Sequence, residues 1–304
     1  MALLNTLLLL LVAVAIPGLI NRTRARLAGR RGIRFTQHLR DIRLQLRKGA
    51  VYSTTTSALF RAAPSVYLGA TLVAALLIPV GDLPPVLSFD GDVAAFAYLL
   101  ALGRMALILA AMDTGSPFEG MGASREALYG ALAEPALLLT AGTLALVSDY
   151  TSFVAIFAAD AAADAQVAII LLLAAYILLK LLFTESGRIP VDDPRTHLEL
   201  TMIHEVMCLD YCGVDLATIR IAGWIKSASF ALLAADAATA PFCAHWWAAA
   251  PAAILLAGLS VGIVESTQAR NKLVRNTTFI LTIAALAALV LFTGYLLRLN
   301  IGLA

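Results

Sequence analysis

Charged residues are scarce in this sequence. Asp, Glu, Lys and Arg together make up 14% of its 304 residues, whereas hydrophobic residues make up 61%. Soluble domains carry roughly 25% charged residues. So low a share of charge excludes an ordinary water-soluble domain and places the chain in the membrane class.

Long apolar runs take the place of the missing charge. A hydrocarbon core of roughly 30 Å requires about 20 apolar residues in a helix, and such runs recur along the whole chain. We therefore predict an all-α integral membrane protein in which residues 1–304 form a single membrane domain. Eight spanning helices are expected, at 2–20, 60–80, 93–112, 127–148, 164–183, 217–237, 243–264 and 277–299.

Cysteine and histidine are few as well, with three and four residues. The cysteines (Cys208, Cys212 and Cys243) form no CxxC pair, which excludes the usual pattern of an iron–sulfur cluster. His197 and His204 are seven residues apart, or ~10 Å along a helix, too far to share one zinc ion. We expect no catalytic residue, metal or redox cofactor on this chain, so that partner proteins carry any electrons.

The charges that are present divide the loops into two kinds. Between Asn21 and Gly49 lie ten of the 22 basic residues and one acid, Asp41. Loops 81–92 and 149–163, with their flanks, contain no Lys or Arg, and their acids are Asp82, Asp90, Asp92, Asp149, Asp160 and Asp164. The positive-inside rule therefore predicts a large basic first loop in the cytoplasm, with both termini outside.

Two interpretations of this basic loop stay open. It is a solvated loop that also contacts anionic headgroups of the lipid bilayer, or it is a docking surface for a soluble partner. Its apolar residues fall near helical spacing beside arginines, which predicts a surface helix: Ile33, Leu39, Ile42 and Leu46. We expect no nucleic-acid partner for an integral membrane chain.

The first polar segment, residues 113–135, opens the fourth span. Its Gly and Pro residues predict a break in the helix, after which Ser124 caps the next helix. Glu134 follows two turns deeper and precedes Pro135, which frees a backbone carbonyl. Glu134 is therefore either a neutral acid bonded to that carbonyl or a proton carrier. A functional role is the first hypothesis for an ionisable residue inside a membrane.

The second polar segment, residues 184–211, is extended in its first half because of Gly187, Pro190 and Pro194, and helical from Arg195 onward. Glu185 ends the fifth span with Arg188 close enough in sequence to pair with it. Further charges of the loop are expected to pair within it and hold it ordered for docking. Of the two cations inside spans, Arg104 and Lys226, we prefer Lys226 as the counter-ion of the buried acids.

The segments DTGSPFEGMGASREALYGALAEP (113–135) and ESGRIPVDDPRTHLELTMIHEVMCLDY (185–211) resemble the HycD/HyfC family. These are membrane subunits of formate hydrogenlyase and of related energy-converting NiFe hydrogenases, similar in turn to the heel subunit of respiratory complex I. The resemblance covers essentially the whole chain. It implies a bacterial or archaeal cytoplasmic membrane, and an oxidoreductase complex whose NiFe centre and iron–sulfur clusters lie on partner subunits.

The implied partners are the hydrogenase small and large subunits, an iron–sulfur protein and antiporter-like membrane subunits. The resemblance implies a subunit that anchors this arm and couples its redox step to movement of protons or sodium ions. The coupling residues would be Glu134, Glu185, Asp192, Glu199, Glu205 and Lys226, and the residues that order or dock the loops would be Arg125, Arg188, Arg195 and His197.

One departure bears on the alternatives. Arg195 and His197 stand where the complex I loop carries two acids, so the acidic lining of a quinone chamber looks incomplete. A quinone-site subunit of a complex I-type enzyme is the second hypothesis, and a non-conducting membrane anchor is the third. A stand-alone secondary transporter is disfavoured, because the sequence shows no inverted repeat with broken helices.

Overall fold

The predicted helices are found in the computed structural model, which describes residues 1–159, 165–193, 202–242 and 245–299. Eight helices are long and apolar enough to cross a membrane, which confirms the predicted spans. They are α1 (Ala2–Leu27), α3 (Ala58–Ala75), α4 (Asp92–Asp113), α5 (Pro117–Ser148), α7 (Ala165–Glu185), α8 (Gly213–Thr239), α9 (Trp246–Thr267) and α10 (Leu273–Arg298). Among the described residues, three short elements join them: α2 (Gln37–Gln45), α6 (Phe153–Ala159) and the 3-10 turn η2 (Glu205–Cys208).

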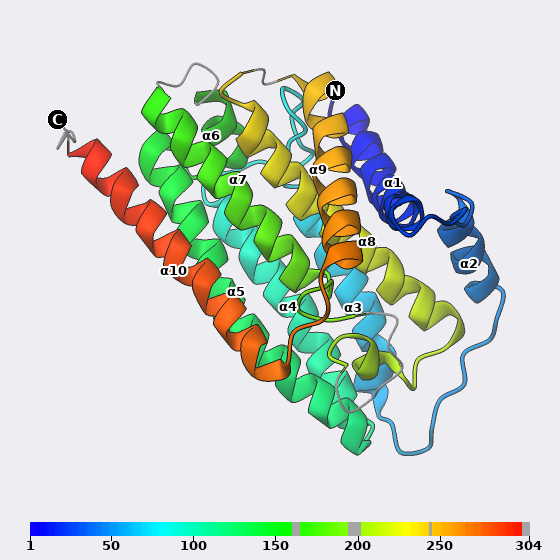
Figure 1. Cartoon of the computed structure of the whole chain (residues 1–304). Helices are drawn as coiled ribbons and strands as arrows, with labels where there is room; N and C mark the ends of the chain where they lie inside the picture. The colour runs from blue at the N-terminus through cyan, green and yellow to red at the C-terminus, as the bar shows by residue number, and fades with distance from the viewer. Residues whose placement is uncertain (160–164, 194–201, 243–244, 300–304) are drawn as a thin grey trace.

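The spanning helices lie side by side in one bundle, with the start of α1 and the end of α10 at the same end (Figure 1). The orientation of that end in the membrane stays a prediction. Helix α8 packs against α1, α3, α7 and α9, and every residue from Ala228 to Ala237 is buried. This part of the helix is accordingly rich in Ala and Leu, since a helix surrounded by others needs small or apolar residues throughout.

Helix α5 begins ten residues earlier than we predicted. Pro117 occupies its first turn, where a missing N–H costs nothing, and the helix continues through Gly120 and Gly122. A Cβ on Gly122 would lie 2.3 Å from Val206 Cγ1 of η2, so this glycine permits close packing and does not break the helix. Ser124 is not a cap, because its hydroxyl donates to the Met121 carbonyl within the helix.

The predicted helix after Arg195 is wrong for the part that the structure describes. Residues 202–212 form turns around η2, and side chains of neighbouring helices hold them. Arg125 donates to the Met202 carbonyl at 2.9 Å, and Glu119 accepts the Asp210 N–H at 3.1 Å. Bonds to other helices therefore replace the bonds of a regular helix. Arg195, His197 and Glu199 lie outside the described residues.

Two smaller expectations concern the first third of the chain. The surface helix of the basic loop is confirmed as α2, in which Ile42 is buried. Helix α3 ends at Ala75, five residues before the predicted end of that span at residue 80. Pro79 explains the difference, because the residue before a proline is disfavoured in helical geometry.

Candidate functional site

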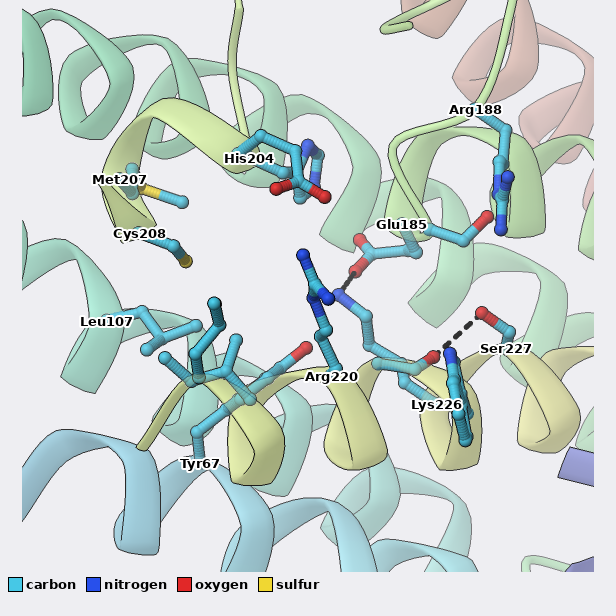
Figure 2. A pocket seen from close by; sticks show the side chains of 16 residues that line it. Tyr67, Leu107, Glu185, Arg188, His204, Met207, Cys208, Arg220, Lys226 and Ser227 are labelled. Carbon is cyan, nitrogen blue, oxygen red and sulfur yellow. Dashed lines mark hydrogen bonds and ion pairs between the residues drawn. The ribbon is translucent and has the colours of Figure 1, made fainter. Parts of the chain in front are cut away.

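A cavity of about 170 Å³ lies between α3, α8 and the end of α7, closed on one side by the turns around η2. Apolar side chains such as Leu107 and Met207 form one wall, as Figure 2 shows. The opposite wall is charged and contains Glu185, Lys226 and His204. A polar cavity of this size has room for several water molecules.

Glu185 and Lys226 form the ion pair on the charged wall. Glu185 is the last residue of α7 and Lys226 lies near the middle of α8, with Nζ 3.3 Å from Oε2. Both side chains are nearly fully buried, and the Lys226 ammonium also lies 5.9 Å from the centroid of the Tyr67 ring. Neither charge reaches the surface, so Lys226 is not a snorkelling side chain.

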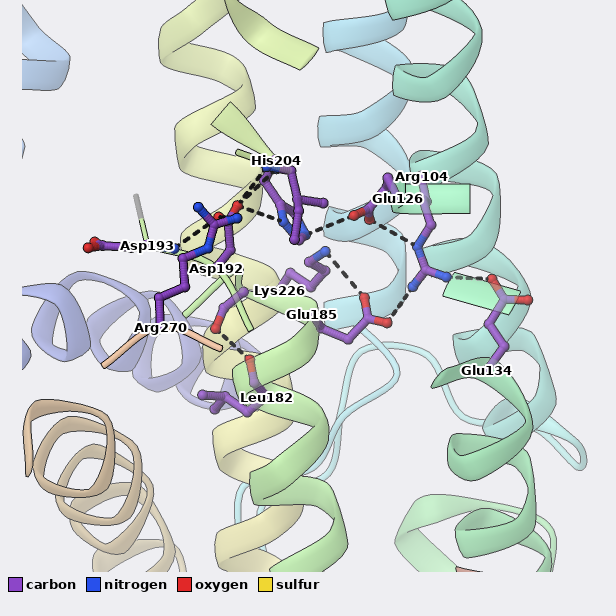
Figure 3. A network of polar contacts seen from close by, with 12 residues as sticks. Arg104, Glu126, Glu134, Leu182, Glu185, Asp192, Asp193, His204, Lys226 and Arg270 are labelled. Atoms are coloured by element: carbon purple, nitrogen blue, oxygen red, sulfur yellow. Dashed lines mark hydrogen bonds and ion pairs between the residues drawn. The ribbon is translucent and has the colours of Figure 1, made fainter. Parts of the chain in front are cut away.

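Arg104 lies behind this wall and is the centre of the polar network in Figure 3. Its buried guanidinium pairs with Glu185 through Nη2. Nη1 is 2.7 Å from Glu134 Oε1, and Nε is 3.4 Å from Glu126 Oε1. One arginine thereby joins carboxylates from α5 and α7 to α4. Lys226 is a counter-ion of a buried acid, as we preferred, and Arg104 is a second one: Glu185 has both cations, and Glu134 pairs with Arg104.

The partners on α5 owe their positions to helical spacing. Glu126, Gly130 and Glu134 are four residues apart, which places them along one face of a helix. Gly130 lies opposite Arg104, and a Cβ there would be 2.2 Å from Nη1. The missing side chain makes the space in which the guanidinium lies between the two glutamates.

His204 connects the cluster to the second polar segment. Its Nε2 is 3.1 Å from Glu126 Oε2, and its Nδ1 is 3.8 Å from Asp192 Oδ2. Asp192 also accepts the N–H groups of Ile203 and His204 at 3.0 and 3.2 Å, and Arg270 lies 3.2 Å away. Asp192 thus holds the segment through partners in the following turn and at residue 270.

The pKa values of these two loop residues shift in opposite directions. Burial opposes the charged form of each. For Asp192, the hydrogen bond and charge of His204, together with Arg270, nevertheless lower the pKa of the carboxyl. For His204, the neighbouring Glu126 and Asp192 raise the pKa of the imidazole. The pair therefore favours its ionised form, in which carboxylate and imidazolium face each other.

We call Arg104, Glu126, Glu134, Glu185, His204 and Lys226 the charge cluster. It contains three carboxylates, two permanent cations and the imidazole of His204, where Glu126 and Asp192 outweigh the effect of burial and raise the pKa. A proton on His204 brings the formal charge of the cluster to zero, and its loss leaves one negative charge.

Arg188 binds at a second site and not to Glu185. Its Nη1 is 3.3 Å from Oε1 of Glu265, a buried side chain on α9, while Arg24 of α1 is 3.1 Å from Oε2. This corrects the expected pairing inside the loop. The loop is instead fastened to two spanning helices, and Asn276 of α10 adds a bond to the Val191 carbonyl at 2.7 Å.

The structure brings together most of the predicted site residues it describes. Glu134, Glu185 and Lys226 belong to the charge cluster, Asp192 lies beside it, and Glu205 lines the cavity. Glu134 is less buried than expected, because 38% of its side chain is exposed on this chain. Its recorded partner is Arg104, which disfavours the hypothesis of a neutral acid bonded to a free carbonyl.

Sequence reasoning missed three cluster members as site residues: Arg104, Glu126 and His204. The four-residue spacing of Glu126, Gly130 and Glu134 was a usable signal for Glu126, and it was overlooked because the helix was expected to start near it. No local pattern pairs His204 with Glu126, because they lie 78 positions apart in the chain and meet only in the fold.

Comparison with known proteins assigns the chain to a family. A family described as NADH dehydrogenase matches residues 1–296. The chain belongs to this family. Hydrogenase-4 component C of Escherichia coli (strain K12) is 33% identical over 219 residues, which are 72% of this chain and 68% of that protein. Formate hydrogenlyase subunit 4 of the same strain is 35% identical over 198 residues, which are 65% and 64% of the two chains.

A solved structure shares the fold of this chain. A chain of the membrane-bound sulfane sulfur reductase, an archaeal respiratory membrane complex, superposes with a TM-score of 0.74 and 22% identity. The match covers 95% of this chain and 98% of that chain. Family membership and the eight apolar helices make this chain a multi-pass protein of the prokaryotic plasma membrane. The resemblance seen in the sequence is confirmed.

Proposed function

We propose that this chain is the membrane subunit of a hydrogenase-type redox complex and that its charge cluster couples the redox reaction to proton movement. The similarity to hydrogenase-4 component C and formate hydrogenlyase subunit 4 supports the first half. The observation that carries the second half is Arg104, which holds carboxylates from two other helices inside the bundle.

Proton exchange requires carboxylates whose affinity for protons can be changed by their neighbours. Moving one charge against 100 mV costs about 2.3 kcal/mol, which corresponds to a pKa change of roughly two units at 1.4 kcal/mol per unit. Glu126, Glu134 and Glu185 share one guanidinium. A shift of Arg104 toward one of them withdraws charge from the others, and a change of this size is within reach of a buried ion pair.

Water has a route to the cluster from the side of the polar loops. The cavity is lined by Glu185 and Lys226 on the cluster side and by Glu205 and Arg220 on the loop side. Helix α7 ends at Glu185, whereas α4 continues from Arg104 to Asp113, about 14 Å further along its axis. The cluster therefore lies in a recess below the ends of longer helices, and waters in the cavity would relay protons to it.

Glu134 is the group through which protons would leave this chain. A charged carboxylate exposed to hydrocarbon is costly, yet 38% of the Glu134 side chain is uncovered. An adjoining antiporter-like membrane subunit would cover it and accept the proton. The loop 186–193 would dock the redox arm. Arg188, Asp192 and Asn276 hold this loop against the bundle, so that it offers an ordered surface to a partner.

The arm would consist of the hydrogenase small and large subunits with an iron–sulfur protein, and it would carry the NiFe centre and the clusters. This chain would contribute no redox centre. The second candidate, a quinone-site subunit, receives less support. The cavity of about 170 Å³ is below the roughly 300–1,000 Å³ typical of small-molecule pockets, and an isoprenoid quinone needs more room still.

Two measurements test this proposal. Purification of the complex in a mild detergent should recover hydrogenase subunits together with this chain, and recovery of the chain alone would contradict the first half. In the complex, Glu134→Gln keeps the size and hydrogen-bonding groups but cannot release a proton. It should assemble and evolve hydrogen while losing redox-driven proton movement. Normal proton movement in an assembled Glu134→Gln complex would show that this carboxyl carries no protons.

A further inference from the structure

Six arginines gather where the chain leaves α1, and they line two adjoining hollows. The larger, of about 770 Å³, lies between the ends of α1 and α9, and the smaller, of about 420 Å³, lies beside it. Arg30, Arg31, Gly32 and Ile33 line both hollows. We call these the arginine groove, whose cations are Arg22, Arg24, Arg26, Arg30, Arg31 and Arg34.

The backbone that follows α1 is built to form this groove. Gly29 has φ +65°, and its N–H bonds to the Arg26 carbonyl while the Arg30 N–H bonds to the Ala25 carbonyl. This pair of bonds is the Schellman motif, which ends a helix and reverses the chain. Phe35 then packs on Gly18 of α1, where a Cβ would be 2.8 Å from its ring. Residues 30–35 are thereby folded back beside the arginines of the helix.

The groove has a large surplus of positive charge. No acid occurs between Asn21 and Phe35, and the one acid that lines the hollows is Glu265. Arg24 and Arg188 already pair with that carboxylate. Within the part of the chain that the structure describes, no ion pair joins the other five arginines of the groove to an acid. The groove therefore fits an anionic ligand.

The position of the groove and its apolar rim indicate the kind of anion. It lies at the ends of two membrane-spanning helices, which is the level of lipid headgroups. Leu27, Ile33 and Phe35 are exposed beside the arginines, at 55%, 55% and 39%. Guanidinium groups bind phosphate oxygens in pairs, and basic pockets between spanning helices at the membrane surface are suited to anionic phospholipids.

We propose that the arginine groove binds the phosphate headgroup of an anionic phospholipid, with the acyl chains lying against Leu27, Ile33 and Phe35. A soluble protein partner matches the groove less well, because the apolar rim lies beside the ends of the spanning helices, where acyl chains begin. This inference does not depend on the proposed role in proton movement.

The test uses the full chain in detergent and a fluorescent phosphatidylglycerol, with phosphatidylcholine as the neutral lipid. Arg30→Gln with Arg31→Gln should weaken phosphatidylglycerol binding by tenfold or more, since both guanidinium groups line both hollows. The matched control is Arg43→Gln with Arg47→Gln, which removes the same charge from the same loop outside the hollows. The control should bind nearly as the unaltered chain does.

Three results would overturn the proposal. Equal binding of phosphatidylcholine would show that the site does not select a negative headgroup. Equal loss in both double variants would indicate general attraction by the loop and no site. Unchanged lipid binding in Arg30→Gln with Arg31→Gln, accompanied by release of the redox arm from the purified complex, would make the groove a protein-docking surface.

Discussion

Helix α8 carries two buried charged groups in very different surroundings. Lys226 belongs to a cluster in which every carboxylate has a cation within 3.4 Å. Asp236 lies ten residues further on, about 15 Å along the helix, and is 2% exposed. Its Oδ1 accepts the Gly81 N–H at 3.0 Å, and no described residue is recorded as a partner of Oδ2.

On the proposed function, this difference separates a site that would exchange protons from a side chain that supports structure. In the cluster, one guanidinium serves three acids, so a proton gained or lost by one group alters the others. Asp236 has one backbone partner, in the turn that carries Asp82, whose carboxylate binds His245 and the Trp246 N–H at the surface. We therefore propose that coupling to other titratable groups, and not burial alone, marks the proton-carrying side chains.

The largest expected effect is the removal of the shared cation. Arg104→Leu leaves Glu126 and Glu134 buried or half-buried without their arginine, and removal of one partner from a buried ion pair costs about 3–5 kcal/mol. We expect the variant complex to lose most of its membrane subunit during purification. Arg104→Lys keeps a charge and should recover part of the yield. A normal yield of Arg104→Leu would show that the cluster is not held by this residue.

A smaller effect should follow from filling the space opposite Arg104. Gly130→Ala places a Cβ 2.2 Å from Nη1, and such overpacking costs about 1–3 kcal/mol. The melting temperature of the complex should fall. Gly142→Ala on the same helix is the control, since nothing lies within 4 Å of a Cβ there, and alanine favours the helix. Equal melting temperatures for the two variants would contradict the packing of Arg104 against α5.

The link between His204 and Asp192 predicts a pH dependence for the ordering of residues 202–212. The pKa of His204 is raised above 6.5, so its contribution is complete below that pH and lost as the pH rises through the raised value. The pKa of Asp192 is lowered below 3.8, so its contribution is complete above 3.8 and lost as the pH falls further.

Protection of this segment from hydrogen exchange should therefore be greatest between pH 3.8 and 6.5. It should decline as the pH rises through the raised pKa of His204, and His204→Gln should remove that decline. Protection that does not decline as the pH rises above 6.5 in the unaltered protein would show that His204 does not hold the segment by its charge.

The smallest effect is expected at Asp236. In Asp236→Asn the amide oxygen can still accept the Gly81 N–H, so stability should change by less than about 1 kcal/mol. Redox-driven proton movement should be unaffected. Loss of proton movement at normal stability would show that Asp236 takes part in proton movement as well as Lys226.

The long apolar runs were sufficient to predict the eight spans, because every span has few charges. The start of α5 was predicted wrongly, because Gly120 and Gly122 look like helix breakers in isolation. Gly122 is a packing position against Val206, and that contact joins residues 84 positions apart. The irregular course of residues 202–212 was missed for the same reason, since its backbone partners belong to other helices.

The site was only partly predictable. Glu134, Glu185 and Lys226 were conspicuous because a charge inside an apolar run is costly and needs a reason. The ion pairs that they form could not be predicted, because Arg104 and Lys226 looked equivalent along the chain. Only the packing of α4 against α5 brings Arg104 to Glu126 and Glu134. Likewise, Arg188 was near Glu185 in sequence yet binds Glu265 in the fold.

The most direct test of the account is the number of protons moved per electron by the complex reconstituted in sealed vesicles. Glu185→Gln removes the carboxylate shared by Arg104 and Lys226, and Asp236→Asn is the buried acid outside the cluster that serves as control. We predict that hydrogen evolution continues in both assembled variants, while Glu185→Gln moves no protons and Asp236→Asn moves them at the normal ratio. A normal ratio in Glu185→Gln would contradict the role of the charge cluster in coupling.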